Sequence, residues 1–152
     1  MAPEITKRTI LLAMYRRVLS EYLITLTDTN FNVVVEQNYA LATLVAETCK
    51  PDLVLVEIPE SGQWRSAEKC LALCDMIRSQ FPHCKQVILC DEKDTITCQA
   101  AIQARQEQRI DDFLFYTNSS KYIFSKLEAL AGFAAKYEKG EENEEVLYEE
   151  QR

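Results

Sequence analysis

Two carboxylates each follow directly after a run of consecutive apolar, strand-forming residues. The run at residues 53–56 ends on Glu57, and the run at residues 87–90 ends on Asp91. Strands that are apolar on consecutive residues are typical of parallel sheets covered by helices on both faces. Ligands and reacting groups gather at the carboxyl edge of such sheets. Glu57 and Asp91 are therefore the first candidates for a functional site.

The environment of Glu57 has two competing interpretations. Carboxylates on neighbouring strands repel each other unless a positive charge lies between them. Arg16 follows the first strand at the mouth of the same crevice, with Arg17 beside it, so an arginine can supply that charge. A divalent ion held by Glu57 and Asp91 is the alternative. The first interpretation makes Glu57 a paired residue at a strand end, and the second makes it a metal ligand.

Residues suited to other kinds of site are few. The six cysteines contain no Cys-x-x-Cys pair, so we expect reduced, mostly buried thiols instead of a zinc site. The only histidine, His83, has no serine or cysteine partner in a context that supports nucleophilic catalysis. No glycine follows the first strand, where a flavin or phosphate loop needs close backbone approach. We expect no cofactor, no metal and no enzyme activity.

Five strand patterns alternate with five helical patterns along the chain. Strands are predicted at residues 8–13, 31–35, 53–57, 86–90 and 112–116, and helices at 15–27, 39–49, 67–80, 94–108 and 119–137. Alternation with short loops demands parallel strands joined by right-handed crossovers. The predicted fold class is α/β: a flavodoxin-like, doubly wound, five-stranded parallel sheet of order 2-1-3-4-5 with helices on both faces. The ends of the first, third and fourth strands then converge on one crevice.

Helical spacing predicts which side of each helix faces the sheet. The expected inward residues are Tyr15, Val18, Leu19, Tyr22, Leu23 and Leu26 in the first helix; Leu41, Leu44, Val45 and Thr48 in the second; Cys70, Leu71, Cys74 and Ile77 in the third; Ile96, Ala100, Ala101 and Ala104 in the fourth; and Ile123, Leu127, Leu130 and Ala134 in the fifth. The fourth helix has the weakest pattern, so we expect it to be the least firmly packed.

Charge divides the 152 residues unevenly. Residues 1–136 carry 15 basic and 17 acidic side chains, whereas residues 137–152 carry 2 and 7. We expect one domain over 1–136 and an acidic, frayed tail over 137–152, with a short binding motif or an extra helical turn at residues 146–148 as the alternative. Without a basic patch, an apolar span or a signal peptide, the sequence predicts no nucleic-acid or membrane partner and a cytoplasmic location.

The chain resembles the receiver domain of two-component response regulators over residues 8 to about 136. The resemblance is carried by Thr9-Ile10-Leu11-Leu12-Ala13, by the segment from Lys50 to Ile58 with its Pro-Asp-Leu-Val-Leu-Val sequence, and by Ile110-Asp111-Asp112-Phe113-Leu114-Phe115. In this comparison the middle segment corresponds to the strand that carries the phosphoaccepting aspartate.

The positions that receivers use for chemistry are altered here. The resemblance places the magnesium-binding acidic pair on Met14 and Tyr15, the phosphoacceptor on Glu57, the hydroxyl residue on Asp91, the phosphoryl-clamping lysine on Tyr116 and the following proline on Thr117. Methionine and tyrosine are poor ligands for a hard cation. The extra methylene of glutamate displaces the carboxylate from the in-line geometry of phosphoryl transfer. We therefore expect a degenerate receiver that is not phosphorylated by the conventional aspartyl mechanism.

Some residues near this edge have a second interpretation. Glu57 can imitate an acyl phosphate, although with one negative charge against about two. Tyr116 either fills the space of the missing lysine or joins Phe115 and Tyr122 in a partner-binding face. Trp64, in the loop after the third strand, is an anchor for a partner if it is exposed and part of the core if it is packed.

The sequence thus predicts an atypical, stand-alone receiver-like signalling domain that acts by protein contact. The resemblance implies docking on a partner, or on a second copy as a homodimer, through the face formed by the fourth helix, fifth strand and fifth helix. The alternative is a flavodoxin-like protein or enzyme that binds a small ligand or metal in the crevice near Glu57 and Asp91.

Overall fold

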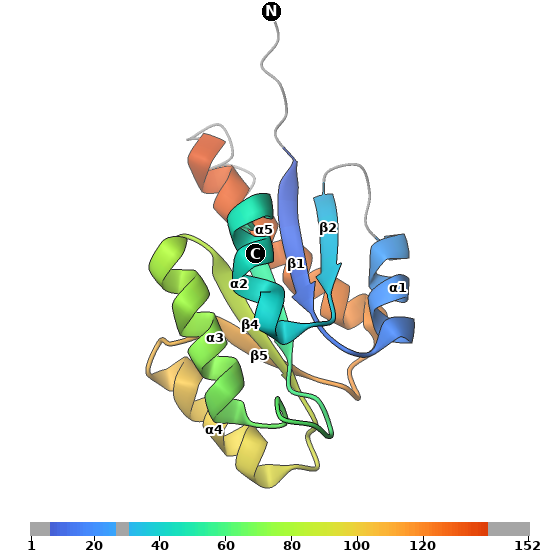
Figure 1. Cartoon of the computed structure of the whole chain (residues 1–152). Helices are drawn as coiled ribbons and strands as arrows, with labels where there is room; N and C mark the ends of the chain where they lie inside the picture. The colour runs from blue at the N-terminus through green and yellow to red at the C-terminus, as the bar shows by residue number, and fades with distance from the viewer. Residues whose placement is uncertain (1–6, 27–30, 140–152) are drawn as a thin grey trace, which may run out of the picture.

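Five parallel strands form one sheet in the order β2-β1-β3-β4-β5 (Figure 1). The computed structural model describes residues 7–26 and 31–139, with the side chains of all but residues 26 and 133–139. The strands are β1 (Arg8–Ala13), β2 (Phe31–Glu36), β3 (Leu53–Glu57), β4 (Lys85–Cys90) and β5 (Asp112–Phe115). The helices are α1 (Arg17–Leu26), η1 (Tyr39–Leu41), α2 (Ala42–Cys49), α3 (Ala67–Gln80), α4 (Thr95–Gln106) and α5 (Ser120–Lys139). The predicted fold class and strand order are confirmed.

The helices cover the sheet in two layers (Figure 1). Helices α2, α3 and α4 lie over one face, and α1 and α5 lie over the other. All six cysteines belong to the core under α2, α3 and α4, where four are buried and two are partly buried. All are free thiols, as predicted.

The central strand is fixed at its start by local hydrogen bonds. Lys50 ends α2 in the left-handed conformation, with φ of 49°, and its N–H donates to Ala46 O at 2.7 Å. Asp52 then makes two hydrogen bonds to Thr9 of β1. Its N–H donates to Thr9 O at 2.8 Å, and its Oδ2 accepts from Thr9 N–H at 2.8 Å. These bonds set β3 beside β1 with Ile10 opposite Leu53, and every residue of β3 is buried.

The predicted inward stripe of the first helix is wrong in part. The helix begins at Arg17, after Tyr15, and its buried side is formed by Ser20 and Leu23. Val18 is 83% exposed, and Tyr15 and Tyr22 are also exposed. Tyr15 does not belong to the helix, because its backbone N–H is held by the Glu57 carboxylate before the helix begins.

The second helix also differs from its prediction. Residues 39–41 form a 3₁₀ turn, capped by the Asn38 side chain, before α2 begins. This change of pitch turns Tyr39, Ala42 and Ala46 inward, whereas Leu41, Leu44 and Thr48, all predicted to face the sheet, are exposed. The third helix agrees with its prediction in bounds and buries all four residues expected to face inward, and Ser66 caps its start.

Helix α4 exposes the largest residue of its predicted stripe. Asp94 caps the helix by accepting from Thr97 N–H at 3.2 Å, and Thr97, Ala101 and Ala104 face the sheet. Ile96 is 79% exposed, so its predicted burial is wrong. Helix α4 therefore contacts the sheet mainly through small side chains.

The C-terminal helix runs to Lys139, past the predicted domain boundary at residue 136. Residues 27–30, between α1 and β2, and the predicted tail from residue 140 lie outside the described residues. Among the described helices, none combines the length and apolar character needed to span a membrane.

Candidate functional site

The Glu57 carboxylate lies inside the protein at the carboxyl end of β3. The residue is 1% exposed. Because Ala13 pairs with Val56, the chain leaving β1 passes directly beside Glu57. Oε1 of Glu57 accepts from Tyr15 N–H at 2.7 Å and from Arg16 N–H at 3.2 Å. Two backbone donors therefore hold one carboxylate oxygen.

Arg16 supplies the positive charge to the other oxygen. Its Nε lies 2.9 Å from Glu57 Oε2, an ionic contact without hydrogen-bond alignment, and its Nη2 donates to Glu60 Oε1 at 2.6 Å. Partial burial lowers the pKa of Arg16, but the hydrogen bond to Glu60 and the charge of Glu57 outweigh it and leave that pKa raised. The predicted ion pair between Arg16 and Glu57 is present.

Tyr116 closes the site from the β5 side. The Arg16 guanidinium carbon lies 3.9 Å from the centre of the Tyr116 ring, a cation–π contact. The Tyr116 hydroxyl donates to Ile58 O, in the loop that follows β3. Burial and the negative charge of Glu57 raise the pKa of Tyr116, against the opposing effect of Arg16. Tyr116 therefore stays a neutral hydrogen-bond donor at ordinary pH.

Three aromatic rings cover Glu57 from the α2 and α3 side. Tyr15 stacks on Tyr39 with ring centres 5.1 Å apart, and Trp64 lies 5.4 Å beyond at a tilted angle. The buried hydroxyl of Tyr39 donates to Glu57 O at 2.6 Å. Burial, followed by the charge of Glu57, raises the pKa of Tyr39. These contacts fix the backbone of Glu57 as well as its side chain.

The residues present do not fit the magnesium ion that the receiver resemblance implies. Met14 is fully buried and has no oxygen in its side chain, and the Tyr15 side chain stacks on Tyr39. Hard cations need several oxygen ligands, preferably carboxylates. Within the described parts of the chain, no three His, Cys, Asp or Glu residues are grouped to hold a metal. Arg16 occupies the charge-balancing role at Glu57 instead.

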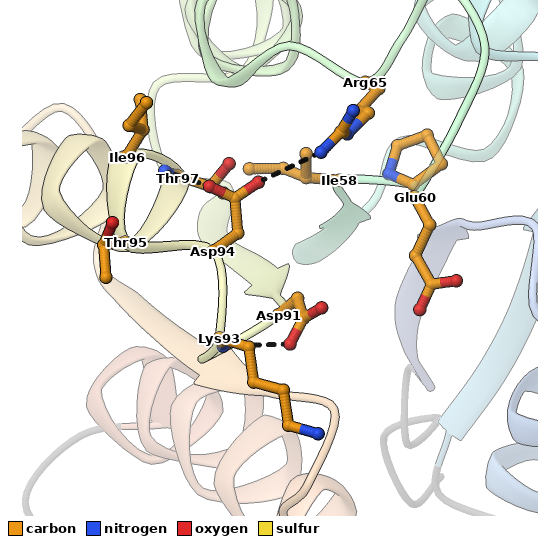
Figure 2. Close-up of a pocket in the computed structure, with 10 residues that line it drawn as sticks. Ile58, Glu60, Arg65, Asp91, Lys93, Asp94, Thr95, Ile96 and Thr97 are labelled. Atoms are coloured by element: carbon orange, nitrogen blue, oxygen red, sulfur yellow. Dashed lines mark hydrogen bonds and ion pairs between the residues drawn. The ribbon is translucent and has the colours of Figure 1, made fainter.

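Asp91 belongs to a separate cleft. Its Oδ1 accepts from Lys93 N–H at 3.0 Å, and the cleft beside it, of about 570 Å³, lies between the loop after β3 and the turn into α4 (Figure 2). Arg65 and Asp94 approach to 3.9 Å across this cleft. Glu57 is not among its lining residues, and the described contacts include none between Glu57 and Asp91. The Glu57 carboxylate is therefore not part of the cleft beside Asp91.

The remaining predicted residues are dispersed around the site. Trp64 is partly buried against the core, so the exposed anchor considered from the sequence is not present. Phe115 is also partly buried, whereas Tyr122 on α5 is 46% exposed. Thr117 is exposed in the loop after β5.

Sequence reasoning missed three groups that complete the site. They are the Tyr39 hydroxyl, the Glu60 carboxylate, and the Cys70 thiol that points to the carbonyl oxygens of Trp64 at 3.4 Å and Glu57 at 4.0 Å. The sequence pattern places Tyr39 and Cys70 on helices and gives no indication of their polar contacts. The one available signal was the proximity of Glu60 to Glu57 in the sequence.

Comparison with known proteins gives matches in structure alone. No family model and no curated protein matches the sequence. A response regulator from Thermotoga maritima is 21% identical, with a TM-score of 0.66 over 83% of this chain and 98% of its own. A response regulator receiver domain protein from Clostridium thermocellum is 12% identical, with a TM-score of 0.63 over 86% of this chain and 98% of its own.

A third similar structure is a receiver domain that belongs to a larger protein. The signal receiver domain of a modulated diguanylate cyclase from Desulfovibrio desulfuricans is 18% identical, with a TM-score of 0.62 over 83% of this chain and 94% of its own. These similarities extend across the described sheet and its helices. The chain has the fold of response regulator receiver domains.

Proposed function

We propose that the protein is a receiver-type signalling domain that works by protein contact, without conventional aspartyl phosphorylation. The fold supports the signalling class, since the similar structures are receiver domains. The observation that carries the rest is that groups of the protein itself already bind both oxygens of the Glu57 carboxylate. Two backbone N–H groups and one guanidinium occupy its carboxylate, and the residue is almost wholly buried.

Because both carboxylate oxygens of Glu57 are already bound, this position lacks the two things that phosphoryl transfer needs. A nucleophile must have a free, correctly placed oxygen in line with the entering phosphorus, and the developing charge needs a cation. Arg16 already neutralises Glu57, and the Tyr116 ring lies where the resemblance places the clamping lysine. The site then has a constant charge arrangement, in which Arg16 and Glu57 replace the exchangeable metal and phosphoryl group.

The proposed contact surface is the face made by α4, β5 and α5. Its elements carry exposed apolar side chains: Ile96, which is 79% exposed, and Ile102 on α4, and Tyr122 on α5. Exposed apolar side chains of this size are suited to burial against another protein. The partner is a signalling protein or a second copy of this chain. Loss of association when Tyr122 is substituted, measured by light scattering, tests this face.

Phosphodonor treatment tests the closed site directly. We expect no mass gain by intact mass spectrometry after incubation with acetyl phosphate and magnesium. We also expect no shift in melting temperature with beryllium fluoride and magnesium. A conventional receiver treated in parallel shows that the reagents are active, because its exposed aspartate gains one phosphoryl group.

The Glu57→Gln variant identifies the source of any mass gain. Gain of one phosphoryl group in the natural chain that disappears in Glu57→Gln contradicts the proposal. A gain that persists in the variant places the modification at another residue and leaves Glu57 closed.

A further inference from the structure

The two edges of the sheet differ in how they are protected. Strand β5 is short and begins at Asp112, which lies near Arg105 and Lys126, so this edge carries charge. Strand β2 is longer and contains Asn32-Val33-Val34-Val35 with no charged residue before Glu36. Natural edge strands usually carry lysine, proline or a bulge that prevents pairing with another chain. Strand β2 has none of these.

Alternation along β2 identifies the backbone groups at its open edge. Glu36 O accepts from Met14 N–H at 3.3 Å, so the backbone of Glu36 points toward β1. Successive residues of a strand direct their N–H and C=O groups to opposite sides. Phe31, Val33 and Val35 therefore direct theirs away from β1, toward the edge that pairs with no described strand.

A groove lies beside the outer strand of the sheet. A groove of about 370 Å³ lies between α1 and the strand, and Val35, Glu36 and Gln37 form its strand side. The side chains of Val33, Val34 and Val35 are each only partly buried, and Asn32 is exposed. Another extended segment can thus approach the outward backbone groups of β2.

We propose that β2 pairs antiparallel with β2 of a second copy, about a two-fold axis at Val34. The side chains then match themselves: Val34 faces Val34, Val33 faces Val35, and Asn32 faces Glu36 of the other copy. Val33 and Val35 exchange both backbone hydrogen bonds, as the outward direction of their N–H and C=O groups requires. The partner is a second copy because the pattern polar-Val-Val-Val-polar is symmetric about Val34.

The charges favour this register. The two Glu36 carboxylates end on opposite sides of the axis, about 14 Å apart along the strands, so they do not repel strongly. A register centred on Val33 instead places Asn32 opposite Val34, which pairs a polar amide with an apolar side chain. The contact uses the β2 edge and leaves the α4, β5 and α5 face free, so it is independent of the proposed function.

Substitution of Asn32 by a basic or an acidic residue tests the register centred on Val34. The full chain is measured by light scattering and sedimentation from about 10 μM to about 1 mM, against a monomer mass of 17.5 kDa. In the proposed dimer, position 32 of each copy lies opposite Glu36 of the other, so Asn32→Lys creates two pairs of opposite charge. We expect dimer affinity to rise about 2- to 30-fold in this variant and to fall by a similar factor in Asn32→Glu. The same charges at Ala72, exposed on α3, are the control and leave affinity unchanged.

The sign of the lysine effect is the decisive result. A lysine on an edge strand ordinarily prevents pairing, so tighter association in Asn32→Lys supports only the register with Glu36 opposite. A monomer at every concentration overturns the inference, and so does weaker association in both Asn32 variants. A dimer lost in Tyr122→Glu but unchanged in both Asn32 variants assigns association to the α4, β5 and α5 face, which also overturns it.

Discussion

At the residue scale, Arg16 decides what the carboxyl edge of the sheet can do. It contacts Glu57, Glu60 and the Tyr116 ring at once, so one side chain joins the segments after β1, β3 and β5. The pairing with Glu57 was predictable, because Arg16 follows the first strand at the edge where the third strand ends. The role of Tyr116 was not predictable, since a sequence gives no indication that a ring will lie under a guanidinium.

Substitution of Arg16 measures whether its ion pair with Glu57 contributes to the stability of the fold. Arg16→Met leaves a buried carboxylate with only its backbone donors, so we expect a loss of about 1–3 kcal/mol in the free energy of unfolding by urea denaturation. This is below the full cost of breaking a buried pair because Arg16 is 37% exposed. Arg17→Met is the matched control: its side chain is 75% exposed and 3.9 Å from Glu21, so the expected loss is below about 0.5 kcal/mol. Equal losses in the two variants contradict the assigned role.

At the element scale, the strands followed the sequence closely and the helices did so only in part. A central strand such as β3 needs only an apolar run and a stop, and both are visible in the sequence. The side of a helix that faces the sheet depends on how the segment before it is held, and neighbouring residues differ in direction by about 100°. Contacts outside the helix fix that segment: Glu57 holds the backbone of Tyr15 before α1, and Asn38 caps a 3₁₀ turn before α2.

The exposed side of α4 gives an element-scale prediction. Ile96 and Tyr122 contribute little to the core because both are exposed, so Ile96→Glu and Tyr122→Glu should each change the free energy of unfolding by less than about 0.5 kcal/mol. The same variants should abolish association through the α4, β5 and α5 face, measured by light scattering. Leu127→Glu is the control that should unfold the protein, because Leu127, on the inner side of α5, is buried in the core. Association that survives both exposed substitutions, and is not the β2 dimer that Asn32→Glu weakens, removes this face from consideration.

At the scale of the whole molecule, the two cores differ in chemistry. The core under α1 and α5 is built from aliphatic and aromatic residues, whereas the core under α2, α3 and α4 contains every cysteine of the chain. Burial raises the pKa of Cys70, Cys84 and Cys90 to about 12. These thiols are therefore protonated and unreactive in the folded protein at neutral pH. Their number can be counted in the sequence. Their gathering in one core depends on which face of the sheet each element packs against.

This thiol-rich core predicts loss of stability in alkaline solution. In the unfolded chain a thiol ionises near pH 8.5, whereas Cys70, Cys84 and Cys90 stay protonated in the fold up to about pH 12. Because the folded pKa is the higher one, the stabilisation is complete below about pH 8.5 and is lost as the pH rises toward 12. Each thiol ionised only in the unfolded chain lowers the free energy of unfolding by about 1.4 kcal/mol per pH unit.

Urea denaturation from about pH 8 to about pH 11 measures this slope, and single substitutions assign it. Cys84→Ala removes one titrating thiol, so we expect the loss of stability per pH unit above about pH 9.5 to decrease by about 1.4 kcal/mol. Leu73→Ala, in the same core, should lower stability equally at every pH and leave the slope unchanged, because it removes packing without a titrating group. Stability that stays constant to about pH 11 would mean that the thiols are accessible to water in the fold, and the closed packing of α3 over β3 and β4 would have to be abandoned.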